Sequence, residues 1–413
     1  MSHSVYEIDF TNQLNLLDSA SFIYKIAHRL SEKKRACWVA GGAVRDFWLG
    51  RTPKDIDLVT DAEDAEILEL FPKAVLVGQK FGVYKLPFHH EGRNIIIDLT
   101  VFREEDDYVD GRRPQTIKRA TPLEDAKRRD FTINALFYDL ENFEVIDFVG
   151  GVEDLQNKVL KCVGDATRRL NEDHLRLLRL ARFKAQFGFS VPVADLQAAT
   201  DLSDLIRTVS GERIYEEVLK IVNSHNEVDF WSQELTQKLW FSLGAEINPE
   251  QLVKLPLLKQ SGFSANQQLV MSVVVLWKYA PEAVEFLKAR LKCSKEEAQL
   301  AKKAIDYHAE VAKGKVALDM ALTVDTERDR DLVLNILDFF AASGDLLQTY
   351  LSDVKKYLET YPKPLLTGGD LVGKCEPAKT LTLLQLVRHM QFEKKIRTSE
   401  EALTYLKNQN LIS

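Results

Sequence analysis

The chain has 413 residues, with 55 lysines and arginines against 62 aspartates and glutamates, which gives a formal net charge of −7 at pH 7. This length predicts two to four compact units, and the ordinary share of hydrophobic and charged residues excludes a fibrous or a disordered protein. The negative charge excludes a protein that coats nucleic acid through bulk attraction, although local basic clusters can still hold phosphates.

Export and membrane insertion are not expected from the sequence. Apolar runs without charges stay well short of the roughly 20 residues that a membrane helix requires, and residues 1–10 lack a basic stretch followed by an apolar one. The four cysteines, Cys37, Cys162, Cys293 and Cys375, are too far apart for a paired zinc or disulfide spacing. We therefore expect a cytoplasmic protein with reduced thiols.

Short runs of β-branched and aromatic residues alternate with helical stretches up to about Gly150. This pattern predicts a mixed sheet flanked by helices, and thus an N-terminal part of the α+β class. The predicted strands are residues 36–40, 55–60, 74–77, 83–88, 95–102 and 143–148.

From Val159 onward the chain is expected to be nearly all helical, because apolar residues recur at spacings of three and four in residues 172–187 and 214–222. A capping box at residues 294–297 and Pro281 mark two helix starts. Residues 361–364 contain two prolines and mark a late boundary. The sequence therefore predicts an α+β head followed by a helical array.

Residues 38–60 contain a predicted anion site. A strand that ends at Ala40 runs into Gly41 and Gly42, where the lack of side chains lets backbone amides approach an anion. A helix start follows, which favours phosphate. Arg45, one turn into that helix, is expected to reach the same phosphates.

Asp55 and Asp57 follow on the next predicted strand. Alternation along a strand predicts that both carboxylates lie on one face, and paired carboxylates suit Mg²⁺. An isolated Asp-x-Asp is usually surface or turn chemistry. Together with the glycine turn and Arg45, however, this pair resembles the nucleotidyltransferase superfamily of the polymerase-β type, which implies metal binding by Asp55 and Asp57.

Residues 127–136 resemble the second motif of class II CCA-adding enzymes and bacterial poly(A) polymerases. The resemblance implies that this motif contacts the incoming ribose and triphosphate. Arg129 is suited to a phosphate, and Asp130 and Asn134 to sugar hydroxyls. Without the upstream residues, the same segment would be only a charged helix start.

Residues 95–103 resemble the family strand that carries a third catalytic carboxylate, here Asp98 where glutamate is more usual. Residues 107–114 resemble the element that couples head and neck when the nucleotide changes; a polar turn is the alternative. The charged segment 104–124 is the candidate for a mobile loop.

Residues 171–183 resemble the family motif that reads the incoming base with amino acids. The resemblance assigns Asp173 and Arg176 to the base, and positions three apart on one helix lie on nearly the same side. Arg179 and Arg182 continue toward the triphosphate. The alternative is an amphipathic helix with Glu172 and Arg176 as a surface ion pair.

Two further segments complete the resemblance. Residues 210–220 look like the next family motif, in which Glu212 and Arg213 would brace the neck. Residues 365–373 look like the start of the tail that grips the tRNA elbow. The expected parts are a catalytic head at 1–150, a neck with the base-reading motif at 151–225, a body at 226–315 and a tRNA-binding tail at 316–413.

The resemblance implies an enzyme that adds CCA to the 3′ end of tRNA from CTP and ATP with Mg²⁺, and it implies no protein partner and no membrane. A poly(A) polymerase and a CC-only or A-only enzyme remain open, although residues 78–81 have one basic residue where poly(A) polymerases often have two. An inactive RNA-binding regulator and an enzyme that modifies small molecules are the alternatives from other classes.

Overall fold

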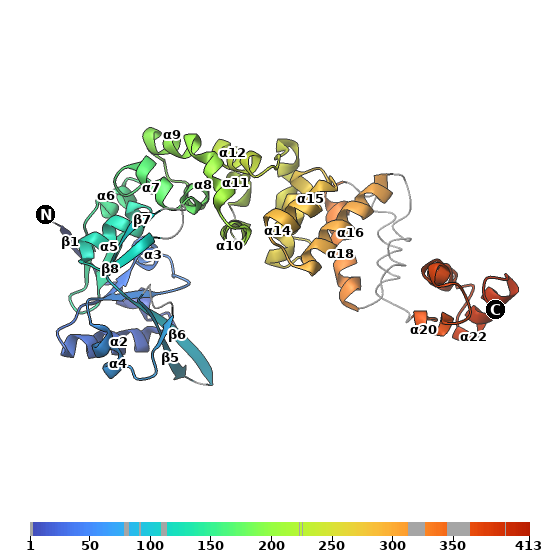
Figure 1. Cartoon of the computed structure of the whole chain (residues 1–413), viewed down its shortest axis with the longest axis horizontal. Helices are drawn as coiled ribbons and strands as arrows, with labels where there is room; N and C mark the ends of the chain where they lie inside the picture. The colour runs from blue at the N-terminus through green and yellow to red at the C-terminus, as the bar shows by residue number, and fades with distance from the viewer. Residues whose placement is uncertain are drawn as a thin grey trace. The chain divides into compact units, whose positions relative to one another are not determined.

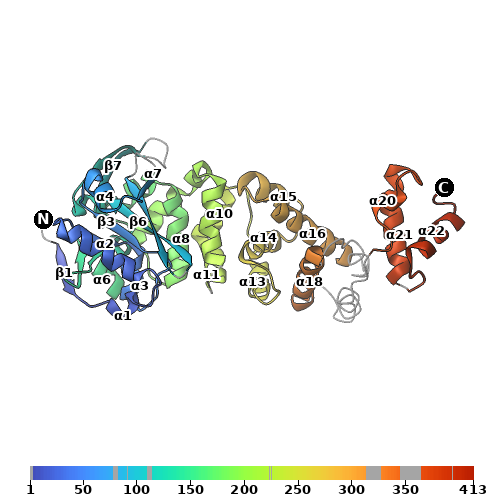
Figure 2. The ribbon, with the colours of Figure 1, turned by 90° about the horizontal axis from the view of Figure 1, so that it is seen from below.

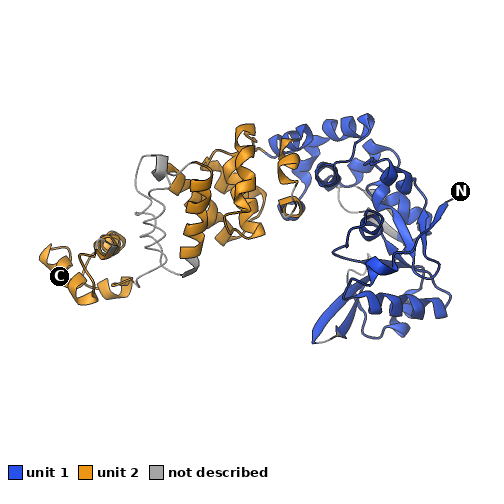
Figure 3. Cartoon of the chain, turned by 180° about the vertical axis from the view of Figure 1, so that it is seen from behind, with its two compact units in different colours: residues 1–217, 233–243 blue, residues 218–232, 244–413 orange. Residues whose placement is uncertain are grey.

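The computed structural model forms two compact units. The first comprises residues 1–217 and 233–243, and the second residues 218–232 and 244–413 (Figure 3). The finer division of the chain into head, neck, body and tail remains a prediction. The structure describes residues 3–77, 82–90, 92–108, 114–222, 224, 226–312, 327–344, 364–392 and 394–413.

A mixed eight-stranded sheet forms the centre of the first unit, in the order β1-β10-β9-β2-β3-β6-β5-β4 (Figure 1). Of the strand pairs in the described residues, β3 with β6 is parallel and the others are antiparallel. The strands are β1 (Ser4–Glu7), β2 (Cys37–Ala40), β3 (Asp57–Thr60), β4 (Val75–Val77), β5 (Val83–His90), β6 (Arg93–Val101), β9 (Leu136–Asp139) and β10 (Glu144–Asp147).

The α+β class is confirmed, and each of the six predicted strands is present within a few residues. The sequence patterns did not reveal β1 and β9, which are four residues each. The candidate mobile loop at 104–124 is also more regular than expected. Strands β7 (Arg103–Tyr108) and β8 (Pro114–Arg119) pair as a separate two-stranded sheet, and residues 109–113 lie outside the described part, as do residues 78–81.

The two faces of the central strands have different surroundings. Leu58 is fully buried on one face, and the adjacent Val59 belongs to a core cluster on the other with Ala40, Phe137 and Ala126. This cluster fastens the centre of the sheet to helix α5 (Pro122–Arg128), which begins with the capping box of Thr121. The residues at the ends of β2 and β3 are therefore held on a rigid base.

The remaining helices of the first unit are amphipathic and bury one face. In α2, Ile23, Ile26, Ala27 and Leu30 are buried at helical spacing, and α2 packs on β2. The helices are α1 (Thr11–Leu14), α2 (Ala20–Glu32), α3 (Gly42–Trp48), α4 (Asp64–Leu70), α6 (Gly151–Gln156), α7 (Ala166–Glu172), α8 (Leu175–Phe187), α9 (Val193–Asp201), α10 (Gly211–Val222, whose last turn belongs to the second unit) and α12 (Glu234–Ser242), with 3-10 turns η1 (Thr132–Asn134) and η2 (Ser203–Thr208).

The second unit is helical throughout its described residues, and α14 packs against α16, which packs against α18 (Figures 1 and 2). The predicted capping box at Ser294 is confirmed, since Ser294 and Glu297 exchange hydrogen bonds at 2.7 and 3.2 Å. The elements are α11 (Glu227–Ser232), η3 (Pro249–Lys254), α13 (Leu255–Leu258), α14 (Ala265–Leu276), α15 (Glu282–Glu285), a π-helical turn η4 (Phe286–Arg290), α16 (Lys295–Ala312), α18 (Glu327–Ala342), α20 (Gly368–Leu371), η5 (Pro377–Lys379), α21 (Thr380–Phe392) and α22 (Ser399–Asn408).

Residues 366–412 have a hydrophobic core of their own. It includes Leu366, Leu371, Val387 and Leu406, so Leu366 and Leu371 of the predicted tail motif at 365–373 are structural, whereas Val372 is exposed. All four cysteines are free thiols, as expected. Among the described residues, none of the helices is long and apolar enough to cross a membrane.

Candidate active site

The predicted glycine turn connects β2 to α3. Gly41 has a φ of 74°, and a Cβ atom placed on it would lie 2.6 Å from the Nη1 atom of Arg129. The backbone conformation therefore favours glycine at this position, and any larger residue would also have to displace the Arg129 guanidinium. Arg45 is buried and donates to Asn134 Oδ1 at 2.5 Å and to Asp46 Oδ1 at 2.8 Å.

The two predicted metal-binding carboxylates lie at and just before the start of β3, which differs from what the alternation predicted. Asp57 is the first residue of β3, whereas Asp55 lies before the strand. The expectation that both aspartates lie on the strand is therefore wrong for Asp55. The reason is that β2 ends at Ala40, the partner of Asp57, and then turns into α3, which leaves Asp55 without a strand to pair with on that side.

Asp57 and Asp98 are directly opposite each other in the parallel pair β3 and β6. Burial raises the pKa of Asp57; Arg129 opposes this shift, and the charges of Asp98 and Asp55 add to it. All three carboxylates therefore act on one small region. Their oxygen atoms fit a hard divalent cation chemically, although no three acidic, histidine or cysteine side chains of the described residues are already arranged as a metal site.

Asp130 connects the second motif to α8. Its Oδ1 atom accepts hydrogen bonds from the Phe131 amide at 2.8 Å and from Asn134 Nδ2 at 3.1 Å, and its Oδ2 atom accepts from Arg179 at 2.8 and 2.6 Å. Burial alone would raise the pKa of Asp130, but the charges of Arg179 and Arg176 and these hydrogen bonds hold it far below its usual value. Asp130 is therefore a buried carboxylate that orients Arg179.

The base-reading segment is not one continuous helix, so this part of the prediction is wrong. Helix α7 ends at Glu172 and α8 begins at Leu175, with Asp173 in an extended conformation between them. Asp173 Oδ1 accepts from the Leu175 amide at 3.1 Å. The carboxylate thus bonds to the start of α8, which breaks the helix where the sequence pattern alone predicted continuity.

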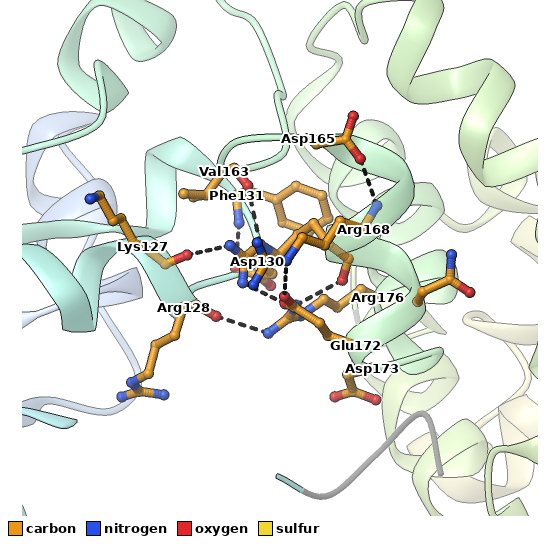
Figure 4. Close-up of polar contacts among 12 residues, drawn as sticks. Lys127, Arg128, Asp130, Phe131, Val163, Asp165, Arg168, Glu172, Asp173 and Arg176 are labelled. Carbon is orange, nitrogen blue, oxygen red and sulfur yellow. Dashed lines mark hydrogen bonds and ion pairs between the residues drawn. The ribbon is translucent and has the colours of Figure 1, made fainter. Parts of the chain in front are cut away.

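Arg176 and Glu172 are paired inside the protein and not on its surface. Arg176 Nη1 donates to Glu172 Oε2 and to the Arg169 carbonyl, both at 2.8 Å, and Nη2 donates to the Arg128 carbonyl at 2.9 Å (Figure 4). The side chains are 9% and 13% exposed. The surface ion pair considered from the sequence is therefore excluded, and the Arg176 guanidinium is fixed against the backbone of the second motif.

One cavity of about 510 Å³ brings most of the predicted residues together. Eight arginines and three aspartates line it, and this excess of positive charge suits a polyanion such as a triphosphate. Of the predicted residues, Gly41, Asp55 and Asp98 do not line the cavity. The lining residues are Gly42, Arg45, Asp57, Arg103, Arg128, Arg129, Asp130, Asn134, Asp173, Leu175, Arg176, Arg179, Arg182, Phe183 and Arg213.

Comparison with known proteins agrees with this arrangement. Residues 37–161 match the family model described as the poly A polymerase head domain. A CCA-adding enzyme of Lactobacillus helveticus is 39% identical over 195 residues, so that the match spans 47% of this chain and about half (48%) of that enzyme. A CCA-adding enzyme of Streptococcus sanguinis is 34% identical over 316 residues, which are 74% of this chain and 75% of that enzyme. The chain belongs to the family of class II CCA-adding enzymes and bacterial poly(A) polymerases.

The fold of this family extends over the helical part of the chain. The crystal structure of the Bacillus stearothermophilus CCA-adding enzyme in complex with CTP aligns with a TM-score of 0.74, at 22% identity, over 95% of this chain and 98% of that one. The sequence resemblance was specific for residues 36–222. The structural likeness shows that the described residues beyond 222 share this fold as well.

Three residues that sequence reasoning missed or underrated hold the site of this family member together. Asp125 is fully buried and accepts from Arg128 at 2.8 Å and from Arg129 at 3.0 Å. Glu217 is buried and binds Arg182. Lys85 donates to both oxygens of Asp98, at 2.9 and 3.1 Å. Asp125 is four residues before Arg129 on a helix, a spacing that the sequence could have revealed.

Proposed function

We propose that the chain is a template-independent nucleotidyltransferase that adds CCA to the 3′ end of tRNA, using CTP, ATP and Mg²⁺. The observation that carries this proposal is the arginine-lined cavity that opens beside Asp57, with the base-reading segment on its wall. In the reaction, the terminal ribose hydroxyl forms a bond to the α-phosphorus while the bond to pyrophosphate breaks. The hydroxyl proton passes to a base or to solvent.

The carboxylates have the first role in this proposal. Asp55 and Asp57 hold Mg²⁺, and Asp98 supplies a third carboxylate beside them. When bound, Mg²⁺ lowers the pKa of the attacking hydroxyl and stabilises the charge of the leaving pyrophosphate. Burial, together with the charges of Asp98 and Asp55, raises the pKa of Asp57, and a bound cation would favour its charged form.

The arginines bind the triphosphate in this proposal. Arg45, Arg129, Arg179 and Arg182 line the cavity, and each is already oriented by a partner. Asp130 and Asn134 bond to each other, to Arg179 and to Arg45. We therefore infer that they orient these arginines as well as meeting the ribose, while Gly41 and Gly42 let the phosphates approach the backbone.

Base selection is assigned to Asp173 and Arg176. Asp173 can accept a hydrogen bond from the exocyclic amine of cytosine or adenine, and Arg176 can donate to the ring acceptor beside it. The buried contacts of Arg176 with the Arg169 and Arg128 carbonyls fix its position relative to the second motif. A fixed pair of this kind can replace a template strand.

The shared fold of the helical part supports tRNA as the substrate, with residues 366–412 as the part that contacts the tRNA elbow. The test uses tRNA transcripts that end before, within or after CCA, each incubated with Mg²⁺ and single labelled nucleotides. Ordered addition of two C residues and one A, followed by arrest, is the expected result. Continued A addition would identify a poly(A) polymerase, partial addition a CC-only or A-only enzyme, and no addition would overturn the proposal.

A further inference from the structure

We propose that Lys85 is a further residue of the nucleotidyl-transfer site, a positioning residue that holds Asp98 until a divalent cation displaces it. The inference rests on the proposed function in one respect, namely that a cation binds at Asp55 and Asp57. The ion pair with Lys85 then controls how readily Asp98 can bind that cation.

The sheet places three charged side chains in one row. Asp57 on β3 is directly opposite Asp98 on β6, and Asp98 is directly opposite Lys85 on β5. Directly opposite residues of neighbouring strands point to the same face of a sheet. The uncharged Ala40 on β2 and Val75 on β4 flank these three residues. Lys85 is therefore the cation that the strand register places beside the two carboxylates.

The contact of Lys85 with Asp98 involves both carboxylate oxygens, at 2.9 and 3.1 Å from Nζ. Lys85 also interacts electrostatically with Asp57. Two carboxylates placed opposite each other repel, and one ammonium group beside them reduces this repulsion. The ammonium therefore already performs, with a single charge, part of the neutralisation that a divalent cation would perform.

The exposure of the pair makes displacement feasible. The side chains of Lys85 and Asp98 are 42% and 36% exposed, and ion pairs that are open to solvent contribute little to stability. A divalent cation bound at Asp55 and Asp57 offers Asp98 twice the charge at short range. Asp98 can then turn from Lys85 toward the cation at little cost, which completes a set of three carboxylates.

The alternative is that Lys85 serves only to reduce the repulsion between the strands. In that case, removing its charge would tighten cation binding through the general field and would do so whether or not position 98 carries a carboxylate. The inference instead requires that the effect of Lys85 on cation binding passes through Asp98. A double-mutant cycle separates these two cases.

The experiment measures Mn²⁺ binding to the full chain by electron paramagnetic resonance in the absence of nucleotide. We expect Lys85→Met to tighten binding about fivefold, the upper end of what an exposed ion pair is worth. Lys85→Arg keeps the charge and should leave binding within about twofold of the parent. In an Asp98→Asn background, Lys85→Met should tighten binding much less, because only the weaker interaction of Lys85 with Asp57 is then removed. Lys33→Met removes a lysine paired with Glu69 at 2.9 Å elsewhere in the unit and controls for net charge.

Each outcome decides a separate point. The role of Lys85 would be overturned if Lys85→Met left Mn²⁺ binding unchanged or weakened it. It would also be overturned if Lys85→Met tightened Mn²⁺ binding equally in the parent and in the Asp98→Asn background. Binding that is absent from the parent, or that survives Asp57→Asn unchanged, would overturn the proposed metal site instead. Lys85→Gln serves as the second uncharged variant, and circular dichroism confirms that each variant is folded.

Discussion

Arg213 donates two hydrogen bonds to Asp173, one to each carboxylate oxygen, at 3.0 and 2.7 Å. The proposed base-reading carboxylate is thus held by α10, forty residues further along the chain, as well as by the start of α8. A bidentate pair fixes the orientation of the carboxylate, so the selectivity of the site depends on both partners.

For Asp173→Ala, we expect addition of C and A to slow by about tenfold to a hundredfold, because the amine of the base loses its acceptor at a cost of roughly 1–3 kcal/mol. UTP incorporation should rise in relative terms, since the penalty against the uracil carbonyl also disappears. Single-turnover incorporation of CTP, ATP, GTP and UTP on matched tRNA ends measures this. Equal slowing of all four nucleotides would show that Asp173 is only structural.

For Arg213→Met, we expect the same direction of change with a smaller magnitude, because Asp173 keeps its charge but loses its fixed orientation. The discrimination between CTP and UTP should fall about tenfold or less, in line with the coupling energies of contacting residues. Adding Arg213→Met to Asp173→Ala should cause little further loss of selectivity. Additive losses would show that Arg213 acts on the site by a route other than Asp173.

Replacement of Asp57 by alanine should slow the addition of every nucleotide by several orders of magnitude. The reason is that the metal stabilises the transition state by several kcal/mol, which no neighbouring group replaces. Asp55→Ala should do the same, although Asp55 lies outside the strand. Binding of tRNA, measured by filter retention, and thermal unfolding should remain near those of the parent. Extension of tRNA by the variant lacking both aspartates would contradict the mechanism.

The buried carboxylate of Asp130 should make stability depend on pH. Its pKa is lowered in the folded state, so its contribution is present above its unfolded pKa of about 3.9 and is lost as the pH falls below that value. Asp130→Asn should cost about 3 kcal/mol at pH 7, because Arg179 loses a buried partner. Thermal unfolding between pH 7 and pH 3 should show a weaker decline for Asp130→Asn than for the parent, with the exposed Asp201→Asn as control.

Glu227 in the second unit should show the opposite dependence. It is buried, accepts from Ser272 at 2.6 Å and from Trp231 at 3.2 Å, and burial raises its pKa despite these donors. A raised pKa means that its stabilising effect is present below the unfolded value of about 4.3 and is lost as the pH rises through the folded value. Glu227→Gln should therefore gain stability relative to the parent as the pH increases from 4 to 8.

Denaturant unfolding of the Glu227 variant and the parent at several pH values measures this difference. The exposed Glu234→Gln, whose residue pairs with Lys238 at the surface, is the matched control and should show no such trend. A difference between Glu227→Gln and the parent that is independent of pH would show that the carboxyl group does not change its protonation between the folded and unfolded states in this range.

The sequence by itself determined much of the chemistry. The glycine turn, Arg45 and Asp57 could be proposed from a strand, a turn and a helix in succession, and Asp130 and Asn134 from the resemblance of residues 127–136 to the second family motif. These local elements form where predicted, since hydrophobic alternation and capping are properties of neighbouring residues. The helical character of the chain after Val159 was visible for the same reason.

Only the tertiary structure decided which partners hold these groups. The orientation of the Asp173 carboxylate depends on Arg213, and the strand start at Asp57 depends on where β2 ends. The pairing of Lys85 with Asp98 depends on the register between β5 and β6. None of these contacts follows from spacing along the chain, because each joins segments that meet only when the sheet and helices pack. The sequence therefore supplied the candidate groups, and the fold decided which of them are fixed or buried.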